Sequence, residues 1–197
     1  MKQRSKRDLR THLIDARSAL PAAERSLHDA AIGAAVLRWL ARHPVDSVGV
    51  YWPIRGEPDL RILYAHLAES GVQLALPLVI GADTPLAFAA WTPGDAVTLN
   101  RWGIGTPDVV VPVSPQVLLI PCVGYDAAGH RLGYGAGYYD RTLAEGAPPQ
   151  AIGIAYTLSL AEFAVEAHDR PMDIVLTEAT PVMPGAGDGH HDGARRG

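Results

Sequence analysis

The first strand–helix–strand pattern of the chain spans residues 47–76, SVGVYWPIRGEPDLRILYAHLAESGVQLAL. Its two ends, Ser47–Tyr51 and Val72–Leu76, are short and rich in residues that favour strands, whereas Asp59–Glu69 between them is typical of a helix. Because parallel strands need a crossover connection, usually a helix, this stretch predicts one unit of a parallel sheet.

The same alternation continues along the chain. Further strands are predicted at Val117–Ile120, Ala151–Ala155 and Ile174–Thr177, and a further helix at Tyr138–Glu145. Several of these strands are apolar without a polar alternation, which indicates a sheet buried on both faces. The segment Thr84–Trp91, followed by Thr-Pro-Gly-Asp, is expected to add a strand and turn at an edge. We therefore predict a three-layer α/β/α fold with a mostly parallel sheet, similar in layout to sugar-phosphate isomerases and CoA-transferases.

Two helices are expected before the first strand. Apolar residues recur at spacings of three and four between Leu9 and Leu20, which gives one helix an apolar stripe. Lys6 and Arg10 lie four residues apart and therefore share a face of that helix. Pro21 suits the first turn of the second helix, which is expected to end before Pro44.

The chain has 197 residues, enough for one sizeable core and short for two ordinary domains. We expect a single domain over residues 1–183. After Pro184 the sequence is dominated by Gly, Asp, His and Arg without an apolar anchor, so residues 184–197 are predicted to form a disordered tail.

Composition limits the possible partners. The net charge of −4, with His neutral, gives no sign of a broad nucleic-acid-binding surface. No apolar run approaches the roughly 18 residues needed to span a bilayer, and no signal-peptide core follows the basic N-terminus. The single cysteine, Cys122, cannot form an internal disulfide, which fits a reducing compartment. We predict a cytoplasmic monomer that acts on a small molecule and binds neither nucleic acid nor membranes.

Residues 131–141, RLGYGAGYYDR, hold the densest group of chemically useful side chains. Their glycines occupy alternate positions over Gly133–Gly137, just before a predicted helix, where backbone amides can approach a ligand and the helix dipole favours an anion. Phosphate is the ligand that such a loop is expected to bind. A tight strand-to-helix turn is the plainer alternative, but such a turn has no need of the flanking Arg131 and Arg141, the adjacent phenols or Asp140.

This loop differs from the common phosphate-binding motifs. It lacks the Gly-Lys-Ser/Thr of a Walker A loop. A dinucleotide-binding fingerprint needs wider glycine spacing in a first β–α unit and an acidic residue about twenty positions later. The sequence therefore predicts a different kind of phosphate site.

Taken in order, the motifs of the chain resemble those of the 5-formyltetrahydrofolate cyclo-ligases, also called 5,10-methenyltetrahydrofolate synthetases. The resemblance runs from about Lys6 to Glu178, and its most specific part is the glycine-tyrosine block. The ordered pieces that carry it are KRDLR, YWPIRGEPDL, LNRWGIGTPD, LLIPCVGYD, RLGYGAGYYDR and HDRPMDIVLTE.

The resemblance implies a reaction that uses ATP and Mg²⁺. In this family the formyl oxygen of 5-formyltetrahydrofolate is phosphorylated by ATP, and N10 then attacks the activated carbon. Phosphate leaves, which gives 5,10-methenyltetrahydrofolate and ADP. An amide-like oxygen is a poor leaving group until it carries phosphate, and such transfer depends on positioning and charge neutralisation.

The resemblance also assigns residues to ATP and metal. Arg131 and Tyr139 are the expected catalytic residues. Asp140 and Asp173 are the expected Mg²⁺ ligands, since carboxylates suit this hard cation; otherwise Asp140 is a first-turn helix charge and Asp173 an ordinary loop acid. The residues expected to bind ATP are Lys6, Arg10, Arg131, Gly133, Tyr134, Gly135, Ala136, Gly137, Tyr138 and Tyr139.

On the folate side, Glu57 matches the glutamate that accepts hydrogen bonds from the pterin. Its alternative is a polar turn residue beside Pro58. Trp102 and Tyr138 are expected to offer flat surfaces to the pterin or aminobenzoate ring, although aromatic residues at such positions are often core.

The chain departs from the family pattern in places. Ala136, Leu60 and Thr106 replace residues common in the family, and the segment YTLSL, Tyr156–Leu160, lacks an expected glutamine. The phosphate and metal half of the predicted site matches better than the folate half. Two alternatives therefore stay open: an ATP-binding relative that acts on another substrate, and a non-catalytic module that binds formyl folate.

Overall fold

The computed structural model describes residues 5–100, 103–166 and 169–184. Its helices and strands follow the predicted alternation. In chain order they are α1 (Lys6–Ser18), α2 (Ala22–Leu40), β1 (Ser47–Gly49), α3 (Arg61–Glu69), β2 (Gln73–Val79), β3 (Leu86–Ala90), β4 (Val97–Leu99), β5 (Gly105–Pro107), β6 (Val117–Pro121), β7 (Gly124–Tyr125), β8 (Arg131–Leu132), α4 (Tyr138–Ala144), β9 (Gln150–Ile154), the 3₁₀ helix η1 (Thr157–Ser159) and β10 (Ile174–Leu176).

A six-stranded sheet forms the centre of the molecule, in the order β10-β9-β6-β1-β2-β3. All its neighbouring pairs are parallel except β2 with β3. The antiparallel edge strand β3 confirms the strand expected within Thr84–Trp91. The mostly parallel sheet confirms the predicted α/β class.

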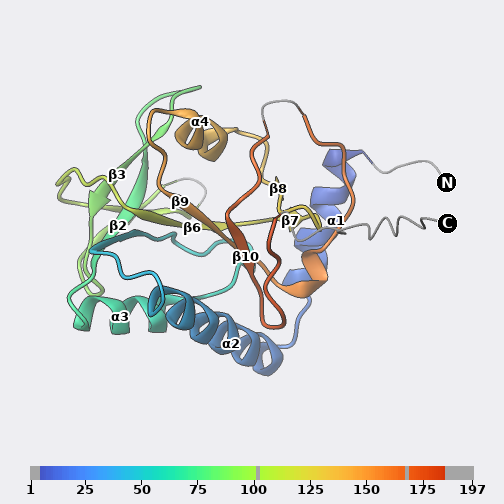
Figure 1. The fold of residues 1–197 in the computed structure, drawn as a ribbon, viewed down its shortest axis with the longest axis horizontal. Helices are drawn as coiled ribbons and strands as arrows, with labels where there is room; N and C mark the ends of the chain where they lie inside the picture. Colours follow the sequence, from blue (N-terminus) through green and yellow to red (C-terminus); the bar gives the residue numbers. More distant parts are fainter. Residues whose placement is uncertain (1–4, 101–102, 167–168, 185–197) are drawn as a thin grey trace, which may run out of the picture.

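Helices cover both faces of this sheet. In Figure 1 the sheet is seen close to edge-on, with α2 and α3 on one side and α4 on the other. Ile32 and Val36 of α2 and Leu63 of α3 are buried in a core that also holds Val48 of β1, whereas Leu143 of α4 packs in a second core on the opposite face. The three-layer prediction is therefore confirmed.

The central strands are sealed on both faces. Each residue from Val117 to Ile120 in β6 is at most 1% exposed, as expected for a strand between two helical layers. Gly49 of β1 leaves room for its neighbour, because a Cβ atom there would lie 2.4 Å from Cδ2 of Leu118. Close packing between β1 and β6 therefore requires glycine at this position.

The first helix stands apart from these layers, beside the small β7–β8 pair (Figure 1). Ser5 caps it by accepting a hydrogen bond from the Asp8 N–H at 3.1 Å. Leu9 and Leu13 then pack with Leu132 of β8 in a third buried cluster. Because β8 leads directly into residues 133–137, this packing brings the N-terminal helix to the glycine-rich loop.

The pairs β4–β5 and β7–β8 were not predicted, because strands of two or three residues leave no readable periodicity. No helix in the described part of the chain is long and apolar enough to cross a membrane. Apart from Pro184, the predicted tail at residues 184–197 lies outside the described residues. The single domain over residues 1–183 stays a prediction.

Candidate functional site

The glycine-rich loop borders a cavity of about 270 Å³. The cavity joins segments far apart in sequence: α1, the β8–α4 connection and the segment before β10. It brings together every residue expected to bind ATP. Its lining consists of Lys6, Arg10, Arg131, Leu132, Gly133, Tyr134, Gly135, Ala136, Gly137, Tyr138, Tyr139, Asp140, Glu166 and Asp169.

The loop needs its glycines at defined positions. Gly135 and Gly137 have φ angles of 97° and 68°, in the left-handed region that residues with a side chain rarely adopt. A Cβ atom on Gly137 would also lie 2.9 Å from Nη1 of Arg141. These glycines are therefore needed for the sharp turn that leads into α4, whether or not a ligand binds there. A tight strand-to-helix turn and a phosphate-binding loop would both have this backbone.

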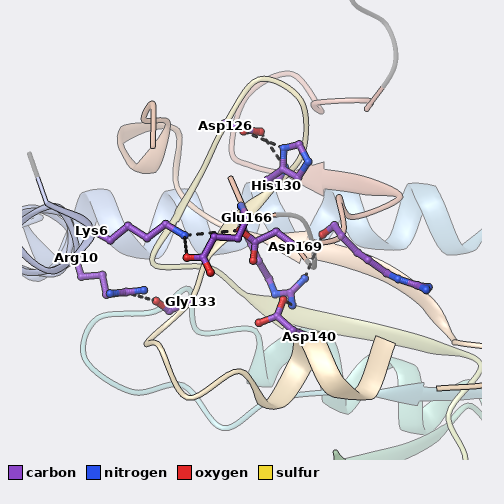
Figure 2. Close-up of polar contacts among 10 residues, drawn as sticks. Lys6, Arg10, Asp126, His130, Gly133, Asp140, Glu166 and Asp169 are labelled. Carbon is purple, nitrogen blue, oxygen red and sulfur yellow. Dashed lines mark hydrogen bonds and ion pairs between the residues drawn. The ribbon is translucent and has the colours of Figure 1, made fainter. Parts of the chain in front are cut away.

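Arg10 fastens the first helix to this loop. Its Nε donates a hydrogen bond to the carbonyl oxygen of Gly133 at 2.7 Å (Figure 2). The guanidinium also lies against Gly135, where a Cβ atom would be 3.6 Å from its Cζ. The basic face predicted for the first helix therefore lies at the cavity.

The other cations at the cavity are paired with carboxylates. Nη2 of Arg131 donates to Oδ1 of Asp140 in the first turn of α4, and the Arg131 side chain is only 5% exposed. Nζ of Lys6 lies 2.8 Å from Oε1 of Glu166 and 3.7 Å from Oδ2 of Asp169 (Figure 2). Opposite charges thus meet in pairs around the cavity, an arrangement that suits a ligand bringing both phosphates and a cation.

The structure separates Asp173 from this group. Its Oδ2 accepts a hydrogen bond from the Ala151 N–H at 2.6 Å, at the start of β9, and Asp173 is absent from the described residues that line the cavity. The carboxylates in the lining are Asp140, Glu166 and Asp169. Within the described residues, no group of three or more His, Cys, Asp or Glu side chains could hold a metal ion. The metal role of Asp173 stays a prediction, and its geometry favours a structural role.

The tyrosines of the loop differ in their surroundings. Burial raises the pKa of Tyr139 above its usual range, with the Glu57 charge as a further cause and Arg131 opposing, so this phenol stays protonated at neutral pH. Tyr138 lies beneath Arg141, whose Cζ is 5.2 Å from the ring centroid. The predicted stacking residue Trp102 lies outside the described residues.

Glu57 is buried, and both carboxylate oxygens already accept hydrogen bonds. Oε2 accepts from the Ile54 N–H at 2.9 Å, and Oε1 accepts from the Tyr134 hydroxyl at 2.7 Å. Burial raises the pKa of this carboxyl, while Arg17 is the largest of the causes that lower it. Its side chain is only 2% exposed, so a substrate reaches Glu57 only if a neighbour moves.

The neighbour that sequence analysis missed is Arg17, whose Nη2 lies 3.7 Å from Oε1 of Glu57. Arg17 is 1% exposed, an unusual place for an arginine. A signal was present, because Arg17 follows Leu13 by four residues and so sits on the apolar stripe of α1. Glu166 and Asp169 were missed for a different reason, since nothing in the sequence shows that their segment folds back onto α1.

The fold and site define an α/β protein in which a glycine-rich loop, three cations and three carboxylates border one cavity. The sequence model of the 5-formyltetrahydrofolate cyclo-ligase family matches residues 2–178. A 5-formyltetrahydrofolate cyclo-ligase of Mycolicibacterium smegmatis is 33% identical over 189 residues, which cover 90% of this chain and 95% of that protein.

Two solved structures agree. The 5,10-methenyltetrahydrofolate synthetase of Aquifex aeolicus superposes with a TM-score of 0.78 at 27% identity, covering 96% of this chain and 99% of that one. The synthetase of Mycoplasma pneumoniae gives 0.75 at 25% identity, covering 89% and 100%. The chain therefore belongs to the 5-formyltetrahydrofolate cyclo-ligase family, a family of ligase enzymes.

Proposed function

We propose that this protein converts 5-formyltetrahydrofolate to 5,10-methenyltetrahydrofolate, with ATP as the second substrate and ADP and phosphate as the other products. The observation that carries this proposal is the cavity where Lys6, Arg10 and Arg131 meet the glycine-rich loop. Three cations beside a loop of exposed backbone are complementary to a polyphosphate chain. Membership of the cyclo-ligase family supports 5-formyltetrahydrofolate as the substrate, and we infer that it receives the phosphoryl group.

The donor set also fits Mg²⁺ bound with the nucleotide. The cation would neutralise phosphate charge, and hard carboxylate oxygens are its preferred protein ligands. Asp140 and Asp169 line the cavity, which makes this pair a better candidate than Asp140 with Asp173. Asp140 is paired with Arg131, and Asp169 with Lys6. In a magnesium nucleotide the metal ion would interact with the two carboxylates and the phosphates with the two cations.

The proposed chemistry has two steps. The formyl oxygen attacks the γ-phosphorus of ATP, and the bond between that phosphorus and the β,γ-bridging oxygen breaks to release ADP. N10 then attacks the activated carbon and loses its proton, and phosphate departs with the formyl oxygen. Arg131 and Lys6 neutralise charge on the transferred group, as phosphoryl transfer requires. Tyr139, held protonated by burial, serves as a hydrogen-bond donor and not as a base.

One assay tests the proposal directly. Purified protein is mixed with Mg-ATP and 5-formyltetrahydrofolate, and the absorbance of the methenyl product is followed together with release of ADP. We expect product and ADP in equal amounts. If ADP is not released with 5-formyltetrahydrofolate but is released when another acceptor replaces it, the enzyme acts on another substrate. If formyl folate binds without turnover, the protein is a binding module. Either result contradicts the proposal.

The same assay tests the residue assignment. Arg131→Ala and Asp140→Ala are each expected to lower turnover by at least about a hundredfold, because each removes one member of a charge pair at the reacting phosphate. Circular dichroism should show that both variants keep the wild-type fold. Unchanged turnover in both would leave the reaction standing and refute the site.

A further inference from the structure

Arg17 links parts of the molecule that the sequence keeps far apart. From α1 its guanidinium donates to the carbonyl oxygen of Arg55 at 2.9 Å and to that of Cys122 at 3.2 Å. It also donates to the hydroxyl of Tyr134 at 2.6 Å. A planar guanidinium can serve several acceptors in fixed directions, which a lysine ammonium cannot reproduce.

Tyr134 passes this contact on to Glu57. Its hydroxyl accepts from Arg17 and donates to Oε1 of Glu57, the same oxygen that lies 3.7 Å from Nη2 of Arg17. Tyr134 belongs to the glycine-rich loop and lines the cavity in which we propose that ATP binds. The three side chains therefore form a continuous network between the predicted nucleotide loop and the predicted folate contact.

The members of this network differ in exposure. Arg17 and Glu57 are buried, whereas Tyr134 is 39% exposed. Tyr134 is therefore the member that has to move when a ligand reaches Glu57. The bonds from Arg17 to the Arg55 and Cys122 carbonyls do not depend on Tyr134, so Arg17 stays beside the carboxylate after the phenol has left.

Arg17 also balances the negative charge of the buried Glu57 carboxylate. Burial raises the pKa of Glu57, and Arg17 and Arg55 oppose that rise. Among the described residues, the other titratable groups that interact with this carboxylate are the thiol of Cys122 and the phenols of Tyr51, Tyr64, Tyr134 and Tyr139, each with a pKa raised first of all by burial. A neutral thiol or phenol cannot balance the charge of Glu57, so Arg17 is the main counter-ion.

We propose that Arg17 is a positioning residue for the second substrate: it holds the Glu57 carboxylate in place for the N–H donors of the pterin after Tyr134, which links both side chains to the glycine-rich loop in the ligand-free protein, has moved aside. This inference rests on the proposed cyclo-ligase function. It assigns to a buried arginine of α1 a role in recognising the substrate without touching it.

The test is the steady-state kinetics of Arg17→Met and Arg17→Lys. The KM for 5-formyltetrahydrofolate should rise at least about tenfold in Arg17→Met and by a smaller factor in Arg17→Lys, since a charge-assisted contact is weakened. The KM for ATP should change by less than about threefold, as the cations at the cavity remain. Arg7→Met, an exposed arginine on the same helix, is the matched control and should leave both constants unchanged.

The pH profile separates positioning from a merely structural role. Without Arg17, Glu57 loses the largest of the influences that oppose the effect of burial on its pKa, so the acidic limb of kcat/KM for 5-formyltetrahydrofolate should move to higher pH in Arg17→Met. A variant that is only less stable would keep the wild-type limb. An unmoved limb together with an unchanged KM overturns the inference.

A paired variant keeps the test decisive if Arg17→Met does not fold. Glu57→Gln removes the buried charge that Arg17 balances, so Arg17→Met should add less than about twofold to the folate KM in the Glu57→Gln background. A second tenfold loss there would show that Arg17 does not act through Glu57. A wild-type protein that forms no methenyl product contradicts the proposed function itself, whereas an active wild type with unaffected Arg17 variants contradicts this inference alone.

Discussion

Nε of Arg10 and the carbonyl oxygen of Gly133 lie 2.7 Å apart, so the first helix is hydrogen-bonded to a loop 123 residues later in the chain. A side chain expected to bind phosphate therefore also holds the loop that surrounds the phosphate. Loss of Arg10 removes a charge and an anchor together.

We expect Arg10→Met to raise the KM for ATP by at least about tenfold, because hydrogen bonds from charged donors are worth more than neutral ones. The KM for 5-formyltetrahydrofolate should stay within about twofold of wild type, since the hydrogen bonds that join Arg17, Tyr134 and Glu57 do not involve Arg10. Steady-state rates with each substrate varied in turn measure both constants. Arg7→Met is the control on the same helix, and an Arg10→Met enzyme with normal ATP dependence would contradict the assignment.

The layers of the fold could be predicted because local pattern and burial agree. Val117–Ile120 is apolar at every position, and it is the strand that lies between helical layers on both faces. The glycine-rich loop was readable for a similar reason, since its unusual backbone angles require glycine at Gly135 and Gly137. The strand and the loop could be predicted because each is determined by the residues of one short segment.

The rest of the site depends on how distant segments meet. The spacing of Arg17 from Leu13 indicates a buried position, but its hydrogen-bond partners Arg55, Cys122 and Tyr134 come from distant segments that no local pattern connects to α1. Asp169 and Asp173 belong to one short motif, and only the path of the chain brings Asp169 to Lys6 and directs Asp173 to β9. Spacing along the sequence could not distinguish these two acids.

The thiol of Cys122 should be inert in the native protein. It is 1% exposed, and burial raises its pKa to about 12, so almost none of the reactive thiolate forms at pH 8. We expect Ellman's reagent to react with Cys122 only after unfolding in urea. Rapid reaction of the folded protein would contradict the buried position.

The same shift predicts a pH effect on stability. An unfolded cysteine ionises near its ordinary pKa, whereas native Cys122 keeps its proton, so its contribution is complete below the unfolded pKa and falls as the pH rises toward 12. Between pH 8 and pH 10 the free energy of unfolding of wild type should fall by about 1–2 kcal/mol more than that of Cys122→Ala. Urea titrations of both proteins at the two pH values measure the difference, and parallel curves would contradict it.

Gly49 should be among the least replaceable positions of the sheet. A Cβ atom there would lie 2.4 Å from Leu118 and 3.2 Å from Phe88, so Gly49→Ala should lower the free energy of unfolding by about 1–3 kcal/mol through overpacking. Gly33→Ala in α2 is the matched control, because its Cβ atom meets Leu63 at an ordinary 3.7 Å. Alanine there should instead stabilise the helix by up to about 1 kcal/mol. Urea unfolding measures both, and equal effects would contradict the packing between β1 and β6.

The metal assignment can be decided with three conservative variants. Asp140→Asn and Asp169→Asn should each raise the Mg²⁺ concentration needed for half-maximal rate and lower turnover, since both carboxylates line the cavity. Asp173→Asn should keep the wild-type Mg²⁺ dependence and instead lose about 1 kcal/mol of stability, because it weakens the hydrogen bond that holds the Ala151 N–H. Rates are measured across a magnesium titration at saturating ATP, and stability by urea unfolding. A shifted Mg²⁺ dependence in Asp173→Asn, with none in Asp169→Asn, would restore the pair Asp140 and Asp173 that the sequence motif suggested.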